Sequence, residues 1–243
     1  MKNLEVKLNS NAIKLIAIAA MTIDHVAWLL FPGNSRELLP LIMHIIGRIS
    51  CPIMCYFVAE GYHYTRNINK YTARLFLFAL LSHVPYMLMF GNGSVIPFAN
   101  GYLLNQTSVI WSLACGLVML RVANSNISEK LKVVVIVAMC IVSLPADWSC
   151  IASLCILAMG TNRGEFKTQM RWMIIYTAMY ALVYMLTMDI LYGLIQMAVV
   201  LAVPVLEMYN GQRGRSRGVN CFMKWLFYIY YPLHLLIMGL IAM

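Results

Sequence analysis

The chain alternates between long apolar stretches and short clusters of charged residues. The first stretch runs from Ala12 to Phe31, and its ionisable members are Lys14, Asp24 and His25. A helix of about 20 mostly apolar residues is long enough to cross a bilayer. We identify about nine such segments, which predict an all-α, polytopic transmembrane helical bundle. Their predicted limits are Ala12–Phe31, Leu41–Tyr62, Tyr71–Phe90, Thr107–Val122, Leu131–Leu144, Trp148–Gly160, Met170–Thr187, Asp189–Tyr209 and Cys221–Met243.

The fifth and sixth segments are shorter than the others, and Pro145 separates them. The pattern is compatible with two tilted helices, two half-inserted helices, or one broken pair around Ala146–Trp148. We expect Asp147, like Asp189, at the outer end of its segment.

Basic residues fall in every second connection between the segments. Lys2, Lys7 and Lys14 precede or open the first segment, and the later clusters are Arg66, Lys70 and Arg74; Arg121, Lys130 and Lys132; Arg163, Lys167 and Arg171; and Arg213, Arg215, Arg217 and Lys224. The alternate connections carry only Arg36. Because cytoplasmic loops are enriched in Lys and Arg, we expect the N-terminus in the cytoplasm and the C-terminus outside, in a bacterial-type inner membrane.

Composition supports a single integral-membrane domain over residues 1–243. The chain is 62% hydrophobic and 11% charged, with a mean hydropathy of +0.76, whereas soluble domains carry about 25% charged residues. The net charge of +9 comes from the connections between segments and therefore predicts a lipid bilayer, not nucleic acid, as the neighbour. The seven cysteines match no zinc-binding spacing, so we predict no metal site.

Several polar side chains lie at similar depth in these segments. With a rise of about 1.5 Å per residue, six residues fall between the middle and the outer half of the membrane: Asp24, His25, His44, Arg48, His83 and His234. Ionisable groups at such depth are rare and are candidates for function. Each could instead be a packing or hydrogen-bonding residue, and Glu60 and His63 are expected in solvent near the inner surface.

Helical phase suggests how these residues meet. Asp24 and His25 are consecutive and point about 100° apart, so we expect Asp24 to pair with Arg48 while His25 faces a cavity. His44 and Arg48 share one helix face, and Gly47 between them permits a close approach of two helices.

A histidine at this depth, with a basic cytoplasmic side, suits transfer of an acyl group from cytosolic acyl-CoA to an amine or hydroxyl at the outer half of the membrane. We predict His25 as general base, with Asp24 and Arg48 positioning or polarising the substrate and His234 completing the catalytic group. The expected substrate pocket adds His44, His83, Tyr231 and Asp147, and the expected ligands of the coenzyme phosphates are Lys14, Arg66 and Arg74.

Short motifs at both ends of the chain resemble the TraX family. They include Met21-Thr22-Ile23-Asp24-His25, Gly47-Arg48-Ile49-Ser50-Cys51-Pro52, Tyr71-Thr72-Ala73-Arg74-Leu75 and Tyr230-Tyr231-Pro232-Leu233-His234. The resemblance implies a membrane acetyltransferase using acetyl-CoA, since the namesake acetylates pilin in conjugative transfer. It also implies that Asp24, His25, Gly47, Arg48 and His234 are the matching polar residues. Ser108–Leu113 departs from the family's expected Asn-x-x-aromatic-Thr-Leu pattern, which leaves the acceptor preference open.

Two other functions remain as alternatives. A proton-coupled transporter or flippase would use the same intramembrane residues, although the chain shows no paired repeats. A non-catalytic membrane scaffold of a conjugation or secretion complex would need these residues for folding alone. If the protein is the predicted enzyme, we expect its acceptor to be a small molecule, glycan, lipid or peptide. The sequence leaves open whether several copies of the chain form a homo-oligomer.

Overall fold

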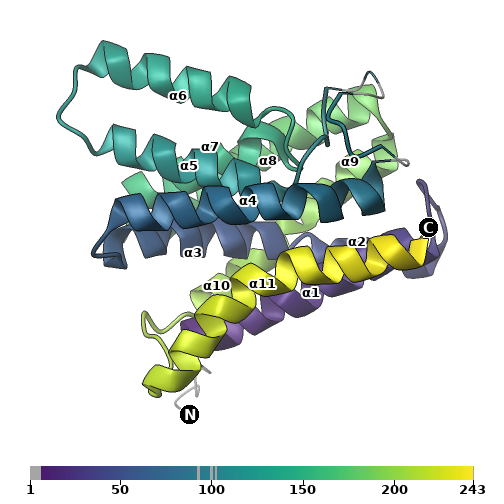
Figure 1. Ribbon diagram of the computed structural model, residues 1–243, viewed down its shortest axis with the longest axis horizontal. Coiled ribbons are helices and arrows are strands. Elements are labelled where there is room, and N and C mark those ends of the chain that lie inside the picture. Colours follow the sequence, from purple (N-terminus) through teal and green to yellow (C-terminus); the bar gives the residue numbers. More distant parts are fainter. Residues whose placement is uncertain (1–6, 92–93, 99–100, 102, 243) are drawn as a thin grey trace. The chain divides into compact units, whose positions relative to one another are not determined.

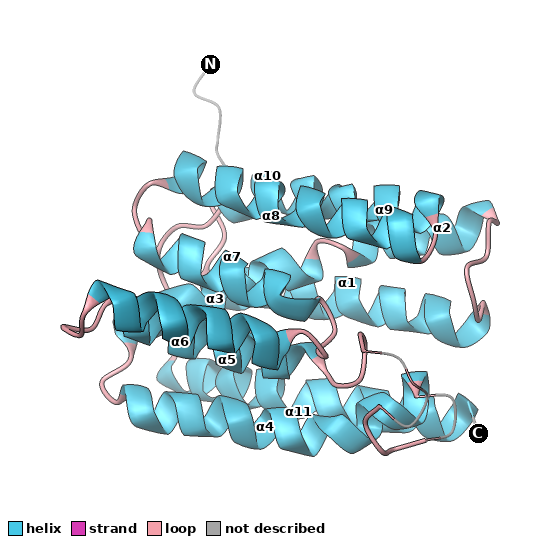
Figure 2. Ribbon diagram, turned by 90° about the horizontal axis from the view of Figure 1, so that it is seen from above, coloured by secondary structure: helices cyan, strands magenta, loops and turns pink. Residues whose placement is uncertain are grey.

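The computed structural model describes residues 7–91, 94–98, 101 and 103–242, and throughout these ranges the regular structure is helical (Figures 1 and 2). The two isolated β-bridges, Leu8 with Tyr209 and Thr107 with Ala146, extend into no sheet in this part of the chain. The all-α prediction is confirmed. The helices are α1 (Ser10–Leu30), α2 (Leu38–Gly47), α3 (Ser50–Tyr64), α4 (Ile68–Phe90), α5 (Val109–Ala123), α6 (Glu129–Ser143), α7 (Ser149–Thr161), α8 (Phe166–Thr187), α9 (Ile190–Gln196), the 3₁₀-helix η1 (Met197–Leu201), α10 (Ala202–Glu207) and α11 (Arg217–Ala242).

Every predicted apolar segment corresponds to helix, and two of them are divided. The second segment bends at Arg48–Ile49, between α2 and α3, and the eighth consists of α9, η1 and α10. Within the described ranges, five stretches are long and apolar enough to cross a membrane: Ser10–Leu30, Leu38–Tyr64, Ile68–Phe90, Ile190–Glu207 and Arg217–Ala242. The chain is therefore a multi-pass membrane protein by the length and composition of its helices, while nine spans and the orientation stay predictions.

The described chain divides into two compact units. The first unit comprises Met1–Met54 and Ala181–Tyr230, and the second comprises Cys55–Tyr180 and Tyr231–Met243. Helices α3, α8 and α11 each contribute to both units. The single-domain prediction for residues 1–243 stays a prediction.

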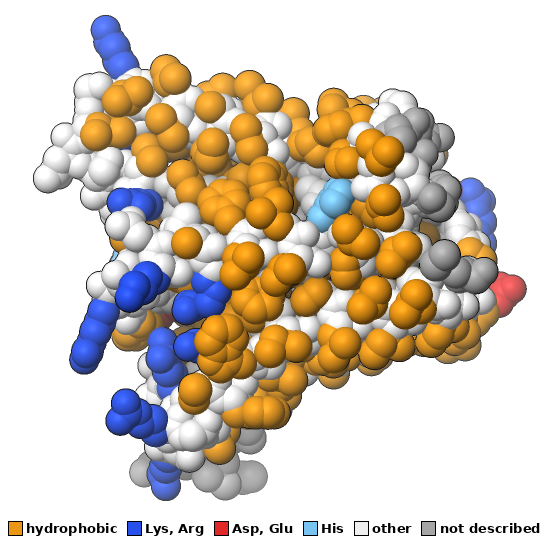
Figure 3. Space-filling view, in the orientation of Figure 1, with side chains coloured by type: hydrophobic (Ala, Val, Ile, Leu, Met, Phe, Trp, Pro, Cys, Tyr) orange, Lys and Arg blue, Asp and Glu red, His pale blue; other side chains and the backbone are white. Residues whose placement is uncertain are grey.

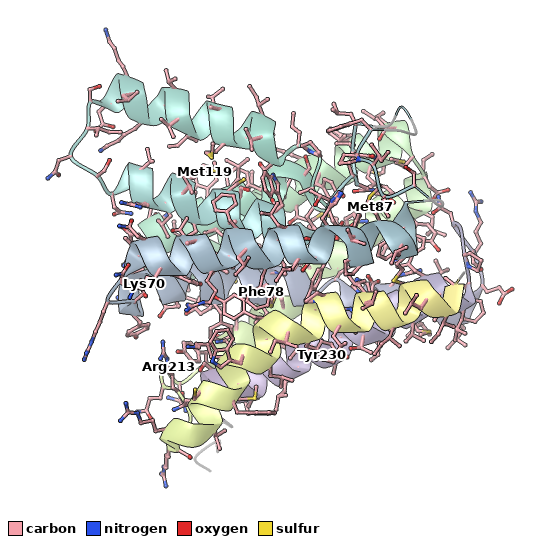
Figure 4. The ribbon with its side chains drawn as sticks, in the orientation of Figure 1. Lys70, Phe78, Met87, Met119, Arg213 and Tyr230 are labelled. Atoms are coloured by element: carbon pink, nitrogen blue, oxygen red, sulfur yellow. The ribbon has the colours of Figure 1, made fainter. Side chains whose placement is uncertain are left out.

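In the first unit, α1 packs along α2, and α2 also contacts α9. The first part of α11 contacts α1 through three pairs of side chains. Asn11 Nδ2 donates to Asn220 Oδ1 over 2.7 Å, and Lys14 Nζ lies 5.3 Å from the centre of the Phe227 ring. The hydroxyls of Thr22 and Tyr230 are 2.6 Å apart, and Tyr230 is labelled in Figure 4. These contacts join the two ends of the first unit, whose contacting residues are 208 or more positions apart in sequence.

In the second unit, α5 lies among α4, α6 and α7. Two serines join α5 to α7: Ser153 Oγ donates to the Ser112 carbonyl over 2.7 Å, and Ser112 Oγ donates to the Ser149 carbonyl. Helices α5 and α7 also approach at Gly116, where a Cβ would lie 2.9 Å from Ser153 Cα. Small residues with interhelical hydrogen bonds are typical of helix packing in membranes.

The connection around Pro145 is tied to the chain that enters α5. The Pro145 carbonyl accepts the Gln106 backbone N–H over 2.7 Å, and Asp147 N donates to the Thr107 carbonyl over 2.8 Å. Helices α6 and α7 are therefore two short helices joined by a hydrogen-bonded turn, which agrees with the broken-pair alternative.

Apolar side chains cover most of the face seen in Figure 3, and Lys and Arg gather at helix ends and loops. Large apolar residues are strongly exposed, with Leu186 at 78% and Ile190 at 68%. Exposed apolar area on this scale is unusual for a soluble monomer and fits contact with lipid.

Candidate functional site

The candidate site is centred on Asp24, which is buried on α1. Arg48 Nη2 donates to Asp24 Oδ1 and Oδ2 over 2.7 and 2.6 Å, so the structure confirms the predicted pair. Gly47 makes the pair sterically feasible, because a Cβ at that position would lie 2.6 Å from Asp24 Cγ. The predicted close approach at Gly47 is likewise observed.

His44 is the second partner of Asp24. Its Nδ1 lies 2.9 Å from Asp24 Oδ1, and because an ionised carboxylate only accepts hydrogen bonds, Nδ1 is the donor. His44 and Arg48 are four residues apart, so both reach the same carboxylate from one face. The sequence placed His44 in the pocket but did not predict this bond to Asp24.

Gln196 and two aromatic residues complete the cluster, and sequence reasoning missed all three. Arg48 Nη1 donates to Gln196 Oε1 over 3.1 Å, and Gln196 Nε2 donates to the Tyr192 carbonyl over 3.2 Å. The rings of Trp28 and Tyr192 lie 4.6 and 5.4 Å from the His44 ring, centre to centre. The available signal was Gln196 itself, an amide in an otherwise apolar segment.

Helix α9 carries Tyr192 and Gln196, and its start is held by Asp189. The carboxylate of Asp189 caps the helix by accepting the Tyr192 backbone N–H over 3.0 Å, and this bond lowers the pKa of Asp189. The Tyr192 hydroxyl donates to the Ser35 carbonyl over 2.9 Å. Cap and tether together fix α9 against the connection between α1 and α2.

His25 and Lys14 also belong to the first unit. His25 is 8% exposed, and the cavity predicted beside it stays a prediction. Arg213 lies in the loop before α11 (Figure 4), and its positive charge repels that of Lys14. Binding of coenzyme phosphates at this end of α1 is untested.

The remaining predicted site residues lie in the second unit, where they form separate contacts. Tyr231 and His234 have rings 5.6 Å apart in an edge-on arrangement. His83 Nδ1 is 3.1 Å from Thr107 Oγ1, and the carbonyl of the same threonine accepts the Asp147 N–H. Arg74 stacks on Tyr71 at 5.5 Å from the ring centre, and Arg66 is exposed. Their predicted association with Asp24 stays a prediction.

The expectation that Glu60 and His63 are solvated is wrong for Glu60. Arg163 Nε donates to Glu60 Oε1 over 2.9 Å, and Glu60 is only 9% exposed. This bond raises the pKa of Arg163. His63 is exposed but lies 3.1 Å from the Gly160 carbonyl through Nε2. The C-terminal end of α3 is covered by the end of α7 and the connection from α7 to α8. This contact between distant segments cannot be predicted from the pattern of α3 alone.

The departure at Ser108–Leu113 has a structural role at Ser112. Its hydroxyl is buried and bonded to α7, so it is not available to an acceptor. Among the residues that the structure describes, no group of three His, Cys, Asp or Glu side chains could hold a metal ion.

These features define a multi-pass helical membrane protein with a buried Arg–Asp–His cluster. The chain belongs to the TraX family, because the family model described as TraX protein matches residues 9–242. It is similar to a probable fimbrial assembly protein FimC, serogroup H1, of Dichelobacter nodosus, at 26% identity over 92% of this chain and 91% of the relative. A shorter match, 35% identical over 32% of this chain and 27% of the relative, is to the uncharacterized protein RP591 of Rickettsia prowazekii. No solved structure matches the chain.

Proposed function

We propose that the protein is a membrane-embedded acyltransferase that moves an acetyl or other short acyl group from acyl-CoA to an amine or hydroxyl. The observation that carries the proposal is the buried Arg48–Asp24–His44 cluster in a chain of the TraX family. The namesake of the family, TraX, is a pilin acetylase, and membership of the family therefore implies an acetyltransferase role in general terms. A carboxylate that orients a histidine is the recurring arrangement for general-base catalysis.

The cluster supports distinct roles for its members. The Nη1 and Nη2 groups of Arg48 are bonded to Gln196 and Asp24, which favours a positioning role for Arg48 over direct stabilisation of an oxyanion. Asp24 orients a histidine, and His25 or His44 takes the proton from the acceptor. Lys14, Arg66 and Arg74 stay candidates for the phosphates of the donor, and acetyl-CoA is the proposed donor.

The acceptor is proposed from the relatives. A relative that covers most of this chain is named a fimbrial assembly protein, so we propose the free amine of a pilin-type peptide as the first acceptor to test. Amino sugars and amine-bearing lipids have the same nucleophile and are the further acceptors. The proposed location is the bacterial inner membrane, with the cytoplasmic side supplying the donor.

The test uses the full-length protein in proteoliposomes with acetyl-CoA and a panel of three acceptors: a peptide with a free N-terminus, glucosamine and phosphatidylethanolamine. We expect release of free CoA thiol together with an acetylated acceptor, and a rise in melting temperature with acetyl-CoA but not with ATP, because a ligand that binds the folded state stabilises it. Neither turnover nor a thermal shift at millimolar acetyl-CoA, in folded protein, would favour the transporter or scaffold alternatives.

A further inference from the structure

His44 is held in one orientation by the first unit. Its ring is 1% exposed and lies against Trp28 and Tyr192. Its Nδ1 donates to Asp24, so the neutral ring carries its lone pair on Nε2. The tautomer and the ring orientation are thus determined by the same contact.

The other ring nitrogen has no protein partner in the described part of the chain. Nε2 of His44 is buried and makes no hydrogen bond there. A buried polar atom without a partner lowers the stability of the folded state, because its lost hydration is not compensated. Such an atom calls for an explanation, and an oriented basic nitrogen is suited to receive a proton from a bound substrate.

Asp24 is itself oriented by Arg48. Arg48 contacts both carboxylate oxygens, and Gln196 holds Arg48. The series therefore runs from Gln196 on α9 to Arg48 at the α2–α3 junction, then to Asp24 on α1 and His44 on α2, and it ends at the unpartnered Nε2. A base that is oriented by a third group is the usual arrangement for activating a nucleophile.

We propose that His44, oriented by Asp24, is the catalytic base of the acyl transfer; this rests on the function proposed above. The acceptor nitrogen or oxygen attacks the thioester carbon, a C–N or C–O bond forms, and the C–S bond breaks. The acceptor proton moves to His44 Nε2 and then to the sulfur of the departing CoA, which restores the neutral ring. Because the ring is covered, the acceptor reaches Nε2 only after a neighbouring side chain moves.

Two substitutions separate this role from a structural one. His44→Asn places an amide N–H near the position of Nδ1, so it keeps the bond to Asp24 but cannot accept a proton. His44→Gln places its amide near Nε2 and serves as the second variant if His44→Asn does not fold. His25→Asn is measured beside them, and His63→Asn is the matched histidine control, since His63 is exposed and bonded to a backbone carbonyl.

The readouts are CoA release with the acceptor panel and the thermal shift with acetyl-CoA. We expect His44→Asn to lose about 10²–10⁴-fold in turnover, the usual contribution of a general base, while its thermal shift is retained. His25→Asn should lose less, and His63→Asn should match the wild type. A loss below tenfold in His44→Asn, or a larger loss in His25→Asn, overturns the assignment to His44 while acyl transfer stands. No turnover by the wild type with any acceptor overturns the proposed function and this assignment together.

Discussion

At the residue scale, the most informative feature is one carboxylate with two partners. Asp24 is 7% exposed and receives hydrogen bonds from Arg48 and His44. In an apolar surrounding, an ionised carboxylate is tolerated only when such partners compensate its lost hydration. The free energy of this site therefore depends on all three groups being present.

Removing Arg48 alone should destabilise the protein. Arg48→Met leaves the Asp24 charge buried with one partner fewer, and loss of one member of a buried pair typically lowers stability by about 3–5 kcal/mol. The melting temperature in detergent should fall markedly. The double variant Asp24→Asn with Arg48→Met should recover much of the loss, since no unpaired charge remains.

The matched control is Arg36→Gln. Arg36 is 75% exposed and lies 3.5 Å from Asp189, and exposed pairs contribute little. Equal losses from Arg48→Met and Arg36→Gln would contradict the buried-pair account.

Gly47→Ala should also damage the cluster, for a steric reason. Its Cβ would overlap Asp24, and forcing one methyl group into a packed position typically costs about 1–3 kcal/mol. We expect a lower melting temperature and reduced turnover. Gly218→Ala is the control, because its nearest neighbour is the Ser216 hydroxyl at 3.9 Å; a Gly47→Ala protein as stable as Gly218→Ala would refute the close-approach argument.

At the element scale, short helices replace what the hydropathy pattern shows as continuous segments. Helix α2 ends at Gly47 and α3 begins at Ser50, and the break leaves Arg48 at the junction. Pro52 in the first turn of α3 is compatible with this start, because the first N–H groups of a helix need no partner within it. The junction therefore places Arg48, within an otherwise apolar segment, in contact with Asp24.

The pairing of α5 with α7 gives the prediction at this scale. Ser153→Val removes the bond to the Ser112 carbonyl and adds volume beside Gly116. Interhelical hydrogen bonds in membranes contribute about 0.6–1.7 kcal/mol, and the added bulk increases the loss. Thermal melting should show clear destabilisation, while Ser153→Ala should lose only the hydrogen-bond part; a Ser153→Val protein with wild-type stability would exclude a close α5–α7 contact.

At the scale of the whole molecule, the distribution of charge predicts the orientation in the membrane. Basic connections alternate with connections that carry only Arg36, and Lys and Arg are retained on the cytoplasmic side. We expect a C-terminal alkaline phosphatase fusion to be active in a Gram-negative bacterial host and the matching green fluorescent protein fusion to be dark. The reverse result would place the C-terminus inside and would mean an even number of spans if the N-terminus is cytoplasmic.

The sequence by itself determined the class of protein and the positions of its helices. Apolar segments of membrane-spanning length must hydrogen-bond their own backbone in lipid, so α1, α4 and α11 lie close to their predicted limits. The Asp24–Arg48 pair was also predictable, because a buried charge demands an opposite one and few are available in the apolar segments. Gly47 followed from the need for close approach at that pair.

Only the tertiary structure decided which groups share the Asp24 carboxylate. Helical phase describes the faces of one helix, but His44, Gln196 and Tyr192 come together through the packing of α1, α2 and α9. The same reason explains Glu60, whose partner Arg163 lies 103 residues away, and Ser112, whose hydroxyl bonds to α7. Sequence pattern specifies the period of a helix, whereas contacts between distant segments depend on how their surfaces fit in three dimensions.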